Sequence, residues 1–486
     1  MKIAALVAYC HSTLRSVDHI GEMVRDLGKG SSLEHMRLHR TKCAKVLAKV
    51  IAPSLMELIV QDIGKSYYSI ICDESTDVAT WKQLPMCVRY FSESQGVIVT
   101  HFLGLVETPR ATAEKVYGAF KAFITRVGLS IQKLLALGTD GGLNLCGRHN
   151  SLYALLKRHD CPHLLLVRCI CHSLDKCASY ASKELPSSLE FMLRESRNWF
   201  SHSSVRKLEY SILHKVILHC FRRSRSWRHS PSTACATRRA RALIHSLFVF
   251  FFQEMFGVEL PLLVRLATTR WLSFYGAVKT HLQQYDALKA LFVKEAAAKD
   301  ACPSVVTLAK MHKDASNLLL LNFMQPHLRE LTQTNVMFQH TYVDITKVYS
   351  DLRVFVFGLA QRIIRPEALR ESAQQGMLRR TELEALQDAL TRTDSLKPLE
   401  SVKYGEPFLS MSQSFLKNGI MTADQIKNIK MYCANFLVKL CKEIAIRLPD
   451  CINEIEKLRH LAPSKVLAQR ERPLFSSLPL IRKSMS

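Results

Sequence analysis

The stretch YYSIICDESTDVATWKQLPMCVRYFSES, from Tyr67 to Ser94, decides the fold class of this chain. It begins as a short apolar run of the kind found in buried strands, and that run ends directly in Asp73 and Glu74. A second strand follows, in which two sets of side chains alternate: Met86, Val88 and Tyr90 against Cys87, Arg89 and Phe91. Because the chain has a net charge of +25, acids gathered where a buried strand reaches the surface indicate a candidate site.

The segments that follow predict a mixed sheet. They are a strand at 97–107, a helix at 112–127, a strand at 133–140, a helix at 145–159, a strand at 163–172 and a helix from 173. The order is therefore β-β-β-α-β-α-β-α. Three consecutive strands can form an antiparallel meander, and strands separated by helices extend a sheet in parallel. This order predicts an α/β chain whose core has an RNase H-like fold.

Helical periodicity flanks the predicted sheet on both sides. Before it, apolar residues recur at helical spacing, and Pro53 is expected to open a second helix. Residues 260 to 470 read almost entirely as helices. The expected domains are an N-terminal helical region at 1–65, the RNase H-like core at 66–215, a basic atypical insertion at 216–260, an all-α insertion domain at 261–470 and a tail at 471–486.

The segment from Arg206 to Arg241 contains ten Lys and Arg residues but a single acid, Glu209. One interpretation is a basic arm that binds nucleic acid. The other is a poorly ordered insertion, such as a retained non-coding segment. We favour the second, because clusters of Ser, Arg and Phe without a period do not indicate packing.

Composition narrows the class of protein. The 486 residues include 67 Lys and Arg against 42 Asp and Glu, and this excess favours a polyanionic partner such as nucleic acid. The 48% hydrophobic content indicates globular domains, and 15 dispersed cysteines indicate reduced thiols. A signal peptide is not expected, and the apolar run at 247–252 is far shorter than the ~20 residues that span a bilayer. We therefore expect no membrane partner.

Two carboxylates follow predicted strands. Asp73 ends the first strand, and Asp140 follows the fourth in LALGTDGG. If these strands are neighbours, both side chains emerge at one edge of the sheet, where carboxylates can hold Mg²⁺. Two such ions about 3.5–4 Å apart can support phosphodiester cleavage. The simpler alternative is that each Asp caps a turn.

Longer motifs resemble the hAT-family transposases, and in particular transposon-derived proteins that carry BED, MYM-type or SCAN modules. The motifs are CDESTD, VRYF, FLGLVE, TAEKVYGAF, GTDGG.N..G.HNSLYALLK, CICHSLDKCAS, LPSSLEFMLRESRNWFSHSSVRKLEY and TRWLSFYGAVKTHLQQYDALKALF. They extend over about residues 1 to 470, with an interruption near 216–260. The resemblance implies an RNase H-like transposase core, a nuclear location and DNA as a partner.

The resemblance also implies roles for single residues. Asp73 matches the first acid of the family's Asp-Asp-Glu metal site, and Asp140 matches the second. Cys169 and His172 match a Cys-x-x-His motif beside that site.

An Arg-Trp pair, Arg270 and Trp271, matches the start of the family's helical insertion. In active members this pair helps to handle the DNA end. A guanidinium can hold phosphate and an indole can stack on a base, so the residue types suit that task. Trp271 could equally be a core anchor at a helix start.

The sequence also departs from the family pattern. The third acid belongs to a C-terminal dimerisation segment that this sequence lacks, and neither Glu454 nor Glu456 matches it. Leu143 occupies the usual Asn position, and Asn144 lies one residue later. No Cys/His zinc finger precedes residue 60, and the helical region is shorter than in full transposases. These departures predict an inactive transposase derivative that needs no cofactor, and Mg²⁺ would be required only if it were active.

A zinc site at RCICHSLDKC is a weaker interpretation. The spacing of Cys169, Cys171, His172 and Cys177 is not that of common zinc modules. A packing and hydrogen-bonding role for Cys169 and His172 is the alternative that we prefer.

The leading hypothesis is a catalytically inactive, transposon-derived nuclear protein that binds DNA or chromatin partners. A second is an active Mg²⁺-dependent transposase or endonuclease, with the missing Glu supplied by Glu74 or by a helical-domain residue. A third is a protein–protein scaffold without nucleic acid, and a fourth is a degenerate gene product. The oligomeric state stays open, because the family's dimerisation segment is absent.

Overall fold

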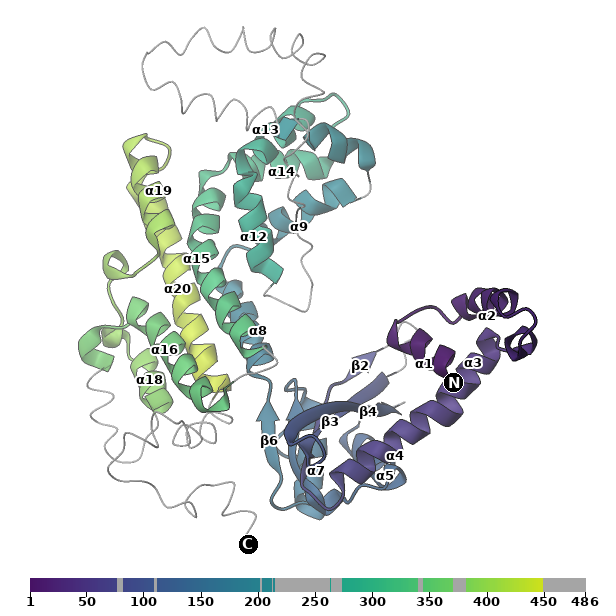
Figure 1. Cartoon of the computed structure of the whole chain (residues 1–486). Helices are drawn as coiled ribbons and strands as arrows, with labels where there is room; N and C mark the ends of the chain where they lie inside the picture. Colours follow the sequence, from purple (N-terminus) through teal and green to yellow (C-terminus); the bar gives the residue numbers. More distant parts are fainter. Residues whose placement is uncertain are drawn as a thin grey trace. The chain divides into compact units, whose positions relative to one another are not determined.

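A computed structural model describes residues 1–76, 82–108, 112–201, 203–211, 213–214, 263, 273–339, 344–369 and 382–448. The described chain forms two compact units, which divide between Cys169 and Ile170 (Figure 1). We describe each unit by itself. The domain boundaries expected near 215, 260 and 470 lie outside the described residues.

The first unit contains the mixed sheet that the strand order predicts. Its strands are β1 (Tyr68–Cys72), β2 (Ser75–Thr76), β3 (Lys82–Ser92), β4 (Val97–Glu107), β5 (Leu134–Thr139) and β6 (Leu165–Arg168). β3 pairs antiparallel with β1 and β4, while β5 pairs parallel with β1 and β6. The short β2 pairs with the start of β3, beyond the end of β1. The spatial order β4-β3-β1-β5-β6 confirms the predicted α/β fold with an RNase-like sheet.

Two predicted elements differ in the structure. The helix expected at 145–159 is two helices, α6 (Leu143–Cys146) and α7 (Leu152–His159). The chain turns at Gly147, where an added Cβ would lie 2.6 Å from the Leu143 carbonyl oxygen, and Ser151 then caps α7 by accepting from the Ala154 amide.

The strand expected at 163–172 is shorter than predicted. It ends at Arg168, and α8 (Ile170–Ala181) begins almost at once, so His172 is helical. The Cys169 amide donates to the carbonyl of Thr139, the last residue of β5. The neighbouring strand stops there, so the chain has no further ladder partner on that side.

One face of the sheet carries the core of the first unit. Helices α4 (Ala52–Ile63), α5 (Ala113–Val127) and α7 lie against it, and η3 (Ile131–Lys133) leads into β5. Buried side chains from the strands alternate with outward ones, as the pattern of β3 predicts. The strand residues of this core include Ile70, Met86, Val88, Tyr90 and Leu137.

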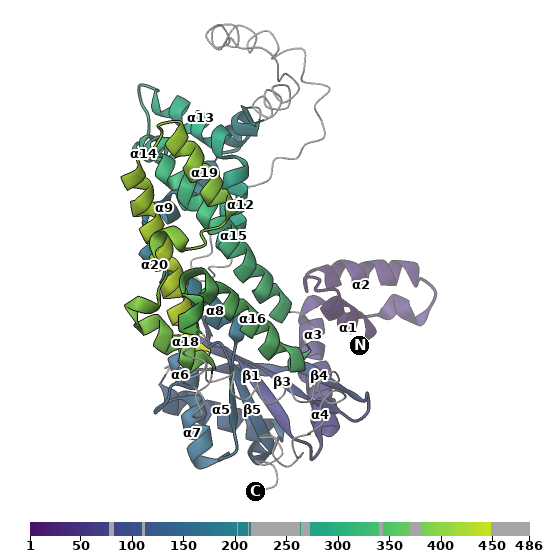
Figure 2. The same ribbon diagram turned by 90° about the vertical axis from the view of Figure 1, so that its left-hand side faces the viewer.

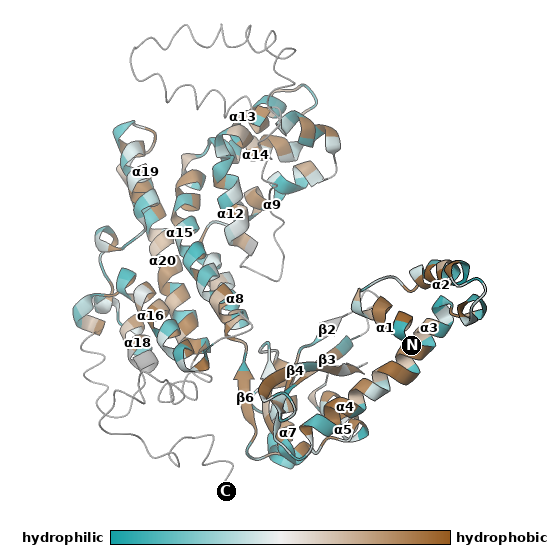
Figure 3. Cartoon of the chain, viewed as in Figure 1, coloured by the Kyte–Doolittle hydropathy of each residue, from teal (hydrophilic) through white to brown (hydrophobic). Residues whose placement is uncertain are grey.

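The opposite face exposes large apolar side chains to solvent, together with a polar row formed by Ser69, Arg89 and Thr100. Paired residues form a row across five strands, Phe102–Cys87–Ile71–Gly138–Val167. We call this surface the exposed sheet face; its large members are Ile98 (61% exposed), Phe102 (59%), Phe91 (51%), Leu105 (51%), Val167 (49%) and Ile71 (44%). Figure 3 shows the hydrophobic colour of β6 and neighbouring strands. Apolar surface of this extent marks an interaction site in many soluble proteins.

The N-terminal helices of the first unit have a small core of their own. They are α1 (Lys2–Tyr9), α2 (Ser16–Leu27), η1 (Ser32–His35), α3 (Arg40–Val46) and a π-helical turn η2 (Leu47–Ile51). Their buried side chains are Ala4, Val7, Val17, Leu38 and Cys43.

Pro53 lies in the first turn of α4, as the sequence predicts, but no break separates this helix from the elements before it. It is the second residue of α4, which follows α3 and η2 without a break (Figure 1). The wider π turn lies immediately before Pro53, where the helix must adapt to a residue that lacks an amide hydrogen. Residues 40–63 therefore form one rod.

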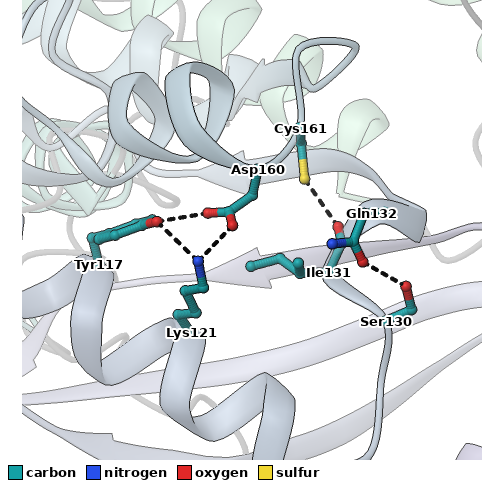
Figure 4. A network of polar contacts seen from close by, with 7 residues as sticks. All are labelled: Tyr117, Lys121, Ser130, Ile131, Gln132, Asp160 and Cys161. Atoms are coloured by element: carbon teal, nitrogen blue, oxygen red, sulfur yellow. Dashed lines mark hydrogen bonds and ion pairs between the residues drawn. The ribbon is translucent and has the colours of Figure 1, made fainter.

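A polar network fixes the end of α7 to α5. Asp160 accepts hydrogen bonds from the Lys121 Nζ at 2.6 Å and from the Tyr117 hydroxyl at 2.7 Å, and its side chain is 7% exposed (Figure 4). Next to it, the Cys161 thiol donates to the Ile131 carbonyl at 2.9 Å. The hydrogen bonds from Lys121 and Tyr117 outweigh burial, which alone would raise the pKa of Asp160, so that pKa is lowered.

The second unit is helical throughout its described part, as Figure 2 shows. Its elements after α8 are η4 (Ser182–Glu184), α9 (Ser188–Ser201), α12 (Ser273–Gln283), α13 (Tyr285–Ala296), α14 (Pro303–Lys313), α15 (Ala315–Phe338), α16 (Ile345–Ile363), α18 (Glu382–Thr391), η5 (Thr393–Ser395), η6 (Leu399–Ser401), α19 (Glu406–Lys417) and α20 (Ala423–Arg447). Phe323 of α15 is fully buried and contacts the rings of Tyr404, Phe408 and Phe436. Among the described helices, none combines the length and apolarity that crossing a membrane requires.

Candidate functional site

The parallel pairing of β1 and β5 sets the position of the two aspartates. In this ladder Ile71 pairs with Gly138. Asp73 and Asp140 each lie two residues further along, so the register carries them to matching positions at one edge of the sheet. This is the arrangement that the sequence predicts if the two strands are neighbours. Asp73 is exposed and Asp140 is half-buried.

A tight turn orients the Asp140 carboxylate. Its Oδ1 accepts from the Gly142 amide at 2.8 Å, and the Thr139 hydroxyl accepts from the Gly141 amide at 3.0 Å. Gly141 has φ = +94°, a conformation that strains residues with a Cβ. The turn-capping role considered for Asp140 is therefore present, and its second oxygen is not used by this bond.

Glu74 follows Asp73 at the same edge of the sheet, and its side chain contacts Asn144. The Asn144 Nδ2 lies 3.4 Å from Glu74 Oε2, a long hydrogen bond between exposed groups. Asn144 is the residue displaced by one position from the family pattern. Its contact with Glu74 depends on the fold bringing residues 70 positions apart together, so the sequence alone gave no sign of it.

Burial and the negative charge of the carboxylates raise the pKa of the neighbouring Cys72 thiol. Cys72 is buried at the end of β1. Burial raises the pKa of its thiol to about 12, and the charges of Asp73, Asp140 and Glu74 add to the effect. The Cys72 thiol therefore stays protonated at neutral pH and is not a nucleophile.

β6 brings two further residues to this edge. Arg168 pairs with Thr139 in the β5–β6 ladder, and its Nη2 donates to the Cys146 carbonyl at 3.3 Å. Cys169 follows it, is exposed, and lies alongside the end of β5 through its amide bond to Thr139. Arg168 is a cation at the end of β6, next to the end of β5, that the sequence did not single out; its place at the end of an apolar run was the available signal.

Of the other predicted site residues, only His172 lies among the described residues. His172 is half-buried in α8, in the second unit. In the same helix, Cys171 forms a reciprocal contact with Asn335: its thiol donates to the Asn335 carbonyl at 3.6 Å, and Asn335 Nδ2 donates to the Cys171 carbonyl at 3.3 Å. Cys177 is buried in the core of the helical unit. These contacts agree with packing roles for the cysteines of α8.

Several residues of the sequence analysis lie outside the described residues. They are Arg270, Trp271, Glu454, Glu456 and the basic segment at 216–260.

The donor set at the sheet edge fits a single hard cation better than a pair. Asp73 and Asp140 offer two carboxylates, and Mg²⁺ in proteins is commonly held by one or two carboxylates while it keeps several waters. Within the described ranges no group of three or more His, Cys, Asp or Glu residues is placed to hold one ion. If Mg²⁺ binds, Asp73 and Asp140 are the residues that would hold it, and the ion would supply positive charge for a phosphate oxygen.

A comparison with protein families agrees with this geometry. Residues 16–151 match a family model described as ZMYM1/FAM200, RNase-like domain. The match includes most of the N-terminal helices, β1 to β5 and both aspartates, and it ends at the residue that caps α7. It supports a transposase-derived, RNase-like domain in this part of the chain and thereby confirms the RNase-like core predicted from the strand order.

Proposed function

We propose that this chain is a catalytically inactive, hAT-type transposon derivative that binds DNA in the nucleus. The observation that carries the proposal is the register of Asp73 and Asp140 at one edge of an RNase-like sheet, because this pairing is expected of a metal site inherited from a transposase. The net charge of +25 supports a polyanionic partner.

The inactive state follows from the chemistry that strand cleavage requires. Two metal ions must be held about 3.5–4 Å apart to activate the attacking water and stabilise the leaving oxygen. Asp73 and Asp140 can share one ion, but a second ion needs further carboxylate ligands in fixed positions. Glu74, the nearest further acid in the sequence, is engaged with Asn144. We therefore expect no hydrolysis of a phosphodiester at this edge.

The first test is binding of the full chain to a generic duplex over a salt series. We expect log affinity to fall linearly with log salt, with a slope of about −0.9 for each phosphate contact. No binding at 50 mM salt would remove the DNA-binding part of the proposal.

The second test addresses catalysis. A supercoiled plasmid incubated with the chain and either Mg²⁺ or Mn²⁺ should stay intact. Nicking that disappears in Asp73→Ala would show an active enzyme and overturn the inactive assignment. Nicking that persists in Asp73→Ala would indicate a contaminating nuclease, because the variant lacks one of the two aligned carboxylates.

A protein–protein scaffold without nucleic acid is the second candidate. The exposed sheet face favours it, since apolar surface of this kind is buried in many protein complexes. Light scattering over a concentration series would test self-association. Oligomers that an excess of duplex DNA does not dissociate, together with no DNA binding, would favour the scaffold.

A further inference from the structure

Three lysines of the N-terminal rod form a line of positive charge on its surface. Lys42 and Lys45 belong to α3, and Lys49 belongs to the π turn η2. All three are exposed, and no acidic residue occurs in the sequence between Glu34 and Glu57. We call Lys42, Lys45 and Lys49 the lysine stripe.

The stripe differs from the other cations of this region because its charge is not compensated. Arg40, two residues before it, is held by Asp18, whose carboxylate lies 3.6 Å from the Arg40 Nε and accepts from the Arg40 amide at 2.9 Å. None of the stripe lysines has an acidic partner within the described residues. Like charges at spacings of three and four residues destabilise a helix, so the stripe carries a local cost that a bound polyanion would remove.

The stripe faces away from the core beneath the rod. Cys43 is fully buried in the N-terminal core, and Val46, Leu47 and Ile51 pack against that core. At 3.6 residues per turn, positions 42, 45 and 49 lie on the opposite side, apart from a small rotation that the π turn adds. With a rise of about 1.5 Å per residue, the three ammonium groups extend over about 10 Å.

The chemistry around the stripe favours duplex nucleic acid over an anionic membrane. A helix that binds a membrane surface must insert its apolar face between lipids. Here the apolar residues Val46, Leu47 and Ile51 are already packed against the N-terminal core. Val50, Leu55 and Leu58 of the same rod are exposed, so the vesicle arm of the test below decides against or for a membrane. Lysine ammonium groups are suited to a row of phosphates.

The same region favours a duplex over a single strand. Proteins that bind single strands stack aromatic side chains on the bases. From Arg37 to Ile51 the chain has no Phe, Tyr or Trp. Contacts from this surface would therefore be to the phosphate backbone and independent of base sequence.

We infer that the lysine stripe is the phosphate-backbone contact of this chain for double-stranded nucleic acid. The inference rests on the proposed DNA binding and assigns it to a surface remote in sequence from Asp73 and Asp140. It separates two tasks: the stripe holds the duplex, and the aspartate edge is not required for affinity.

The decisive variant is Lys42→Ala, Lys45→Ala, Lys49→Ala in the full chain. Alanine favours helix, so the rod should persist, and circular dichroism checks it. If each lysine contacts one phosphate, the salt slope falls by about 2.7. Between 50 and 200 mM salt the parent would then lose about 40-fold more affinity than the variant.

A matched control removes the same charge elsewhere. Lys299, Lys313 and Lys417 are exposed in the helical unit, and Lys299→Ala, Lys313→Ala, Lys417→Ala should keep the parental slope. Replacing the stripe by three arginines should also keep it, because the charge stays. If the salt slope falls equally in the alanine variant and in the control, the affinity comes from the total charge of the chain. That result would overturn the assignment of the phosphate contacts to the stripe.

The remaining outcomes are also decisive. A parental slope in the stripe variant, with loss in a variant that replaces Arg222, Arg223, Arg225 and Arg228, would place the contact in the basic segment. Stripe-dependent binding to phosphatidylserine vesicles, with unchanged binding to a 20-base-pair duplex, would assign the stripe to a membrane. If the parent binds no duplex, the proposed function itself fails. If the parent binds a duplex and the stripe variant binds it equally well, only the assignment to the stripe fails.

Discussion

Selected ionisable and aromatic side chains differ in burial between the two units. In the helical unit His281, His312 and His327 are each 1% exposed, and Phe323 is fully buried. In the sheet unit Asp73 faces solvent at a strand end and Phe102 is 59% exposed on the sheet. These histidines and Phe323 belong to the core of the helical unit, whereas Asp73 and Phe102 of the sheet unit lie where a ligand or a partner can reach them. Stability and binding can accordingly be altered separately by substitutions in the two units.

The largest expected contrast is between two phenylalanines. Phe323→Ala should lower the free energy of unfolding of the helical unit by about 3–5 kcal/mol, because it leaves a cavity among packed rings. Phe102→Ala should change that of the sheet unit by about 0.5 kcal/mol or less, since most of the ring is already in water. Hydrogen exchange with mass spectrometry reads each unit separately. A cost above about 2 kcal/mol for Phe102→Ala would contradict the contrast and show that the exposed sheet face is covered in solution.

The next effect is a loss of stability in mild acid that originates in the buried histidines of the helical unit. Burial lowers the pKa of His312 to about 4 and that of His327 to about 4, with the charge of Arg362 adding to the second, and it lowers the pKa of His281 well below its ordinary value. An unfolded histidine binds a proton below about pH 6.5, whereas these folded ones stay neutral. Each should therefore contribute full stability above about pH 6.5 and lose about 1.4 kcal/mol per pH unit as the pH falls towards 4.

His327→Leu tests this origin. The Nδ1 of His327 donates to the Phe323 carbonyl, and its Nε2 has no hydrogen-bond partner. The variant should lose about 2 kcal/mol less than the parent between pH 7 and pH 5, whatever its stability at pH 7. An unchanged acid slope in urea unfolding would mean that His327 titrates normally in the folded chain.

A smaller effect is expected at the ionic network around Asp160 in the sheet unit (Figure 4). Asp160→Asn should cost about 1–2 kcal/mol, because the charged partner of Lys121 and Tyr117 is lost while Lys121, 45% exposed, can regain water. Since the pKa of Asp160 is lowered by its hydrogen bonds, its contribution is present above about pH 4 and disappears as the pH falls through the folded pKa. The parent and the variant should therefore converge in stability once the pH is below the folded pKa of Asp160.

The smallest predicted change is at a helix cap. Thr422 caps α20: its hydroxyl accepts from the Gln425 amide, and the Gln425 side chain accepts from the Thr422 amide. Thr422→Ala should cost about 1 kcal/mol in the helical unit and nothing in the sheet unit. Faster hydrogen exchange in the first turn of α20, without change in β1 or β5, is the expected result. A change in both units would show that they unfold together.

The sheet could be predicted from the sequence because β3 alternates along its length and short apolar runs mark the other strands. Met86, Val88 and Tyr90 are buried as expected, and Phe91 faces outward. What the alternation could not reveal is whether the outward side is covered. Phe91 and Phe102 are as apolar as core residues, and the sequence gives no sign that they lie in water.

The candidate site was predictable to the extent that backbone register determines it. Asp73 and Asp140 follow β1 and β5, which are parallel and adjacent. The strand order alone therefore predicts that both residues lie at one edge of the sheet. The position of Arg168 depends on the residue at which β6 ends. The hydrogen bond between Glu74 and Asn144 depends on the break between α6 and α7. These are tertiary details that a local pattern does not contain. The early end of β6 and the early start of α8 also depend on tertiary structure, because hydrogen bonding to β5 ends at Thr139.

The exposed sheet face has a calorimetric consequence. Any molecule that covers Phe91, Ile98 and Phe102 releases water from apolar surface, and such binding lowers the heat capacity of the system. Phosphate contacts made by lysines bury little apolar surface and instead release counterions. A titration repeated at several temperatures and salt concentrations would thus separate the two kinds of partner. A protein bound to the sheet would change the temperature dependence of the enthalpy, while a duplex on the helix would chiefly change the dependence on salt.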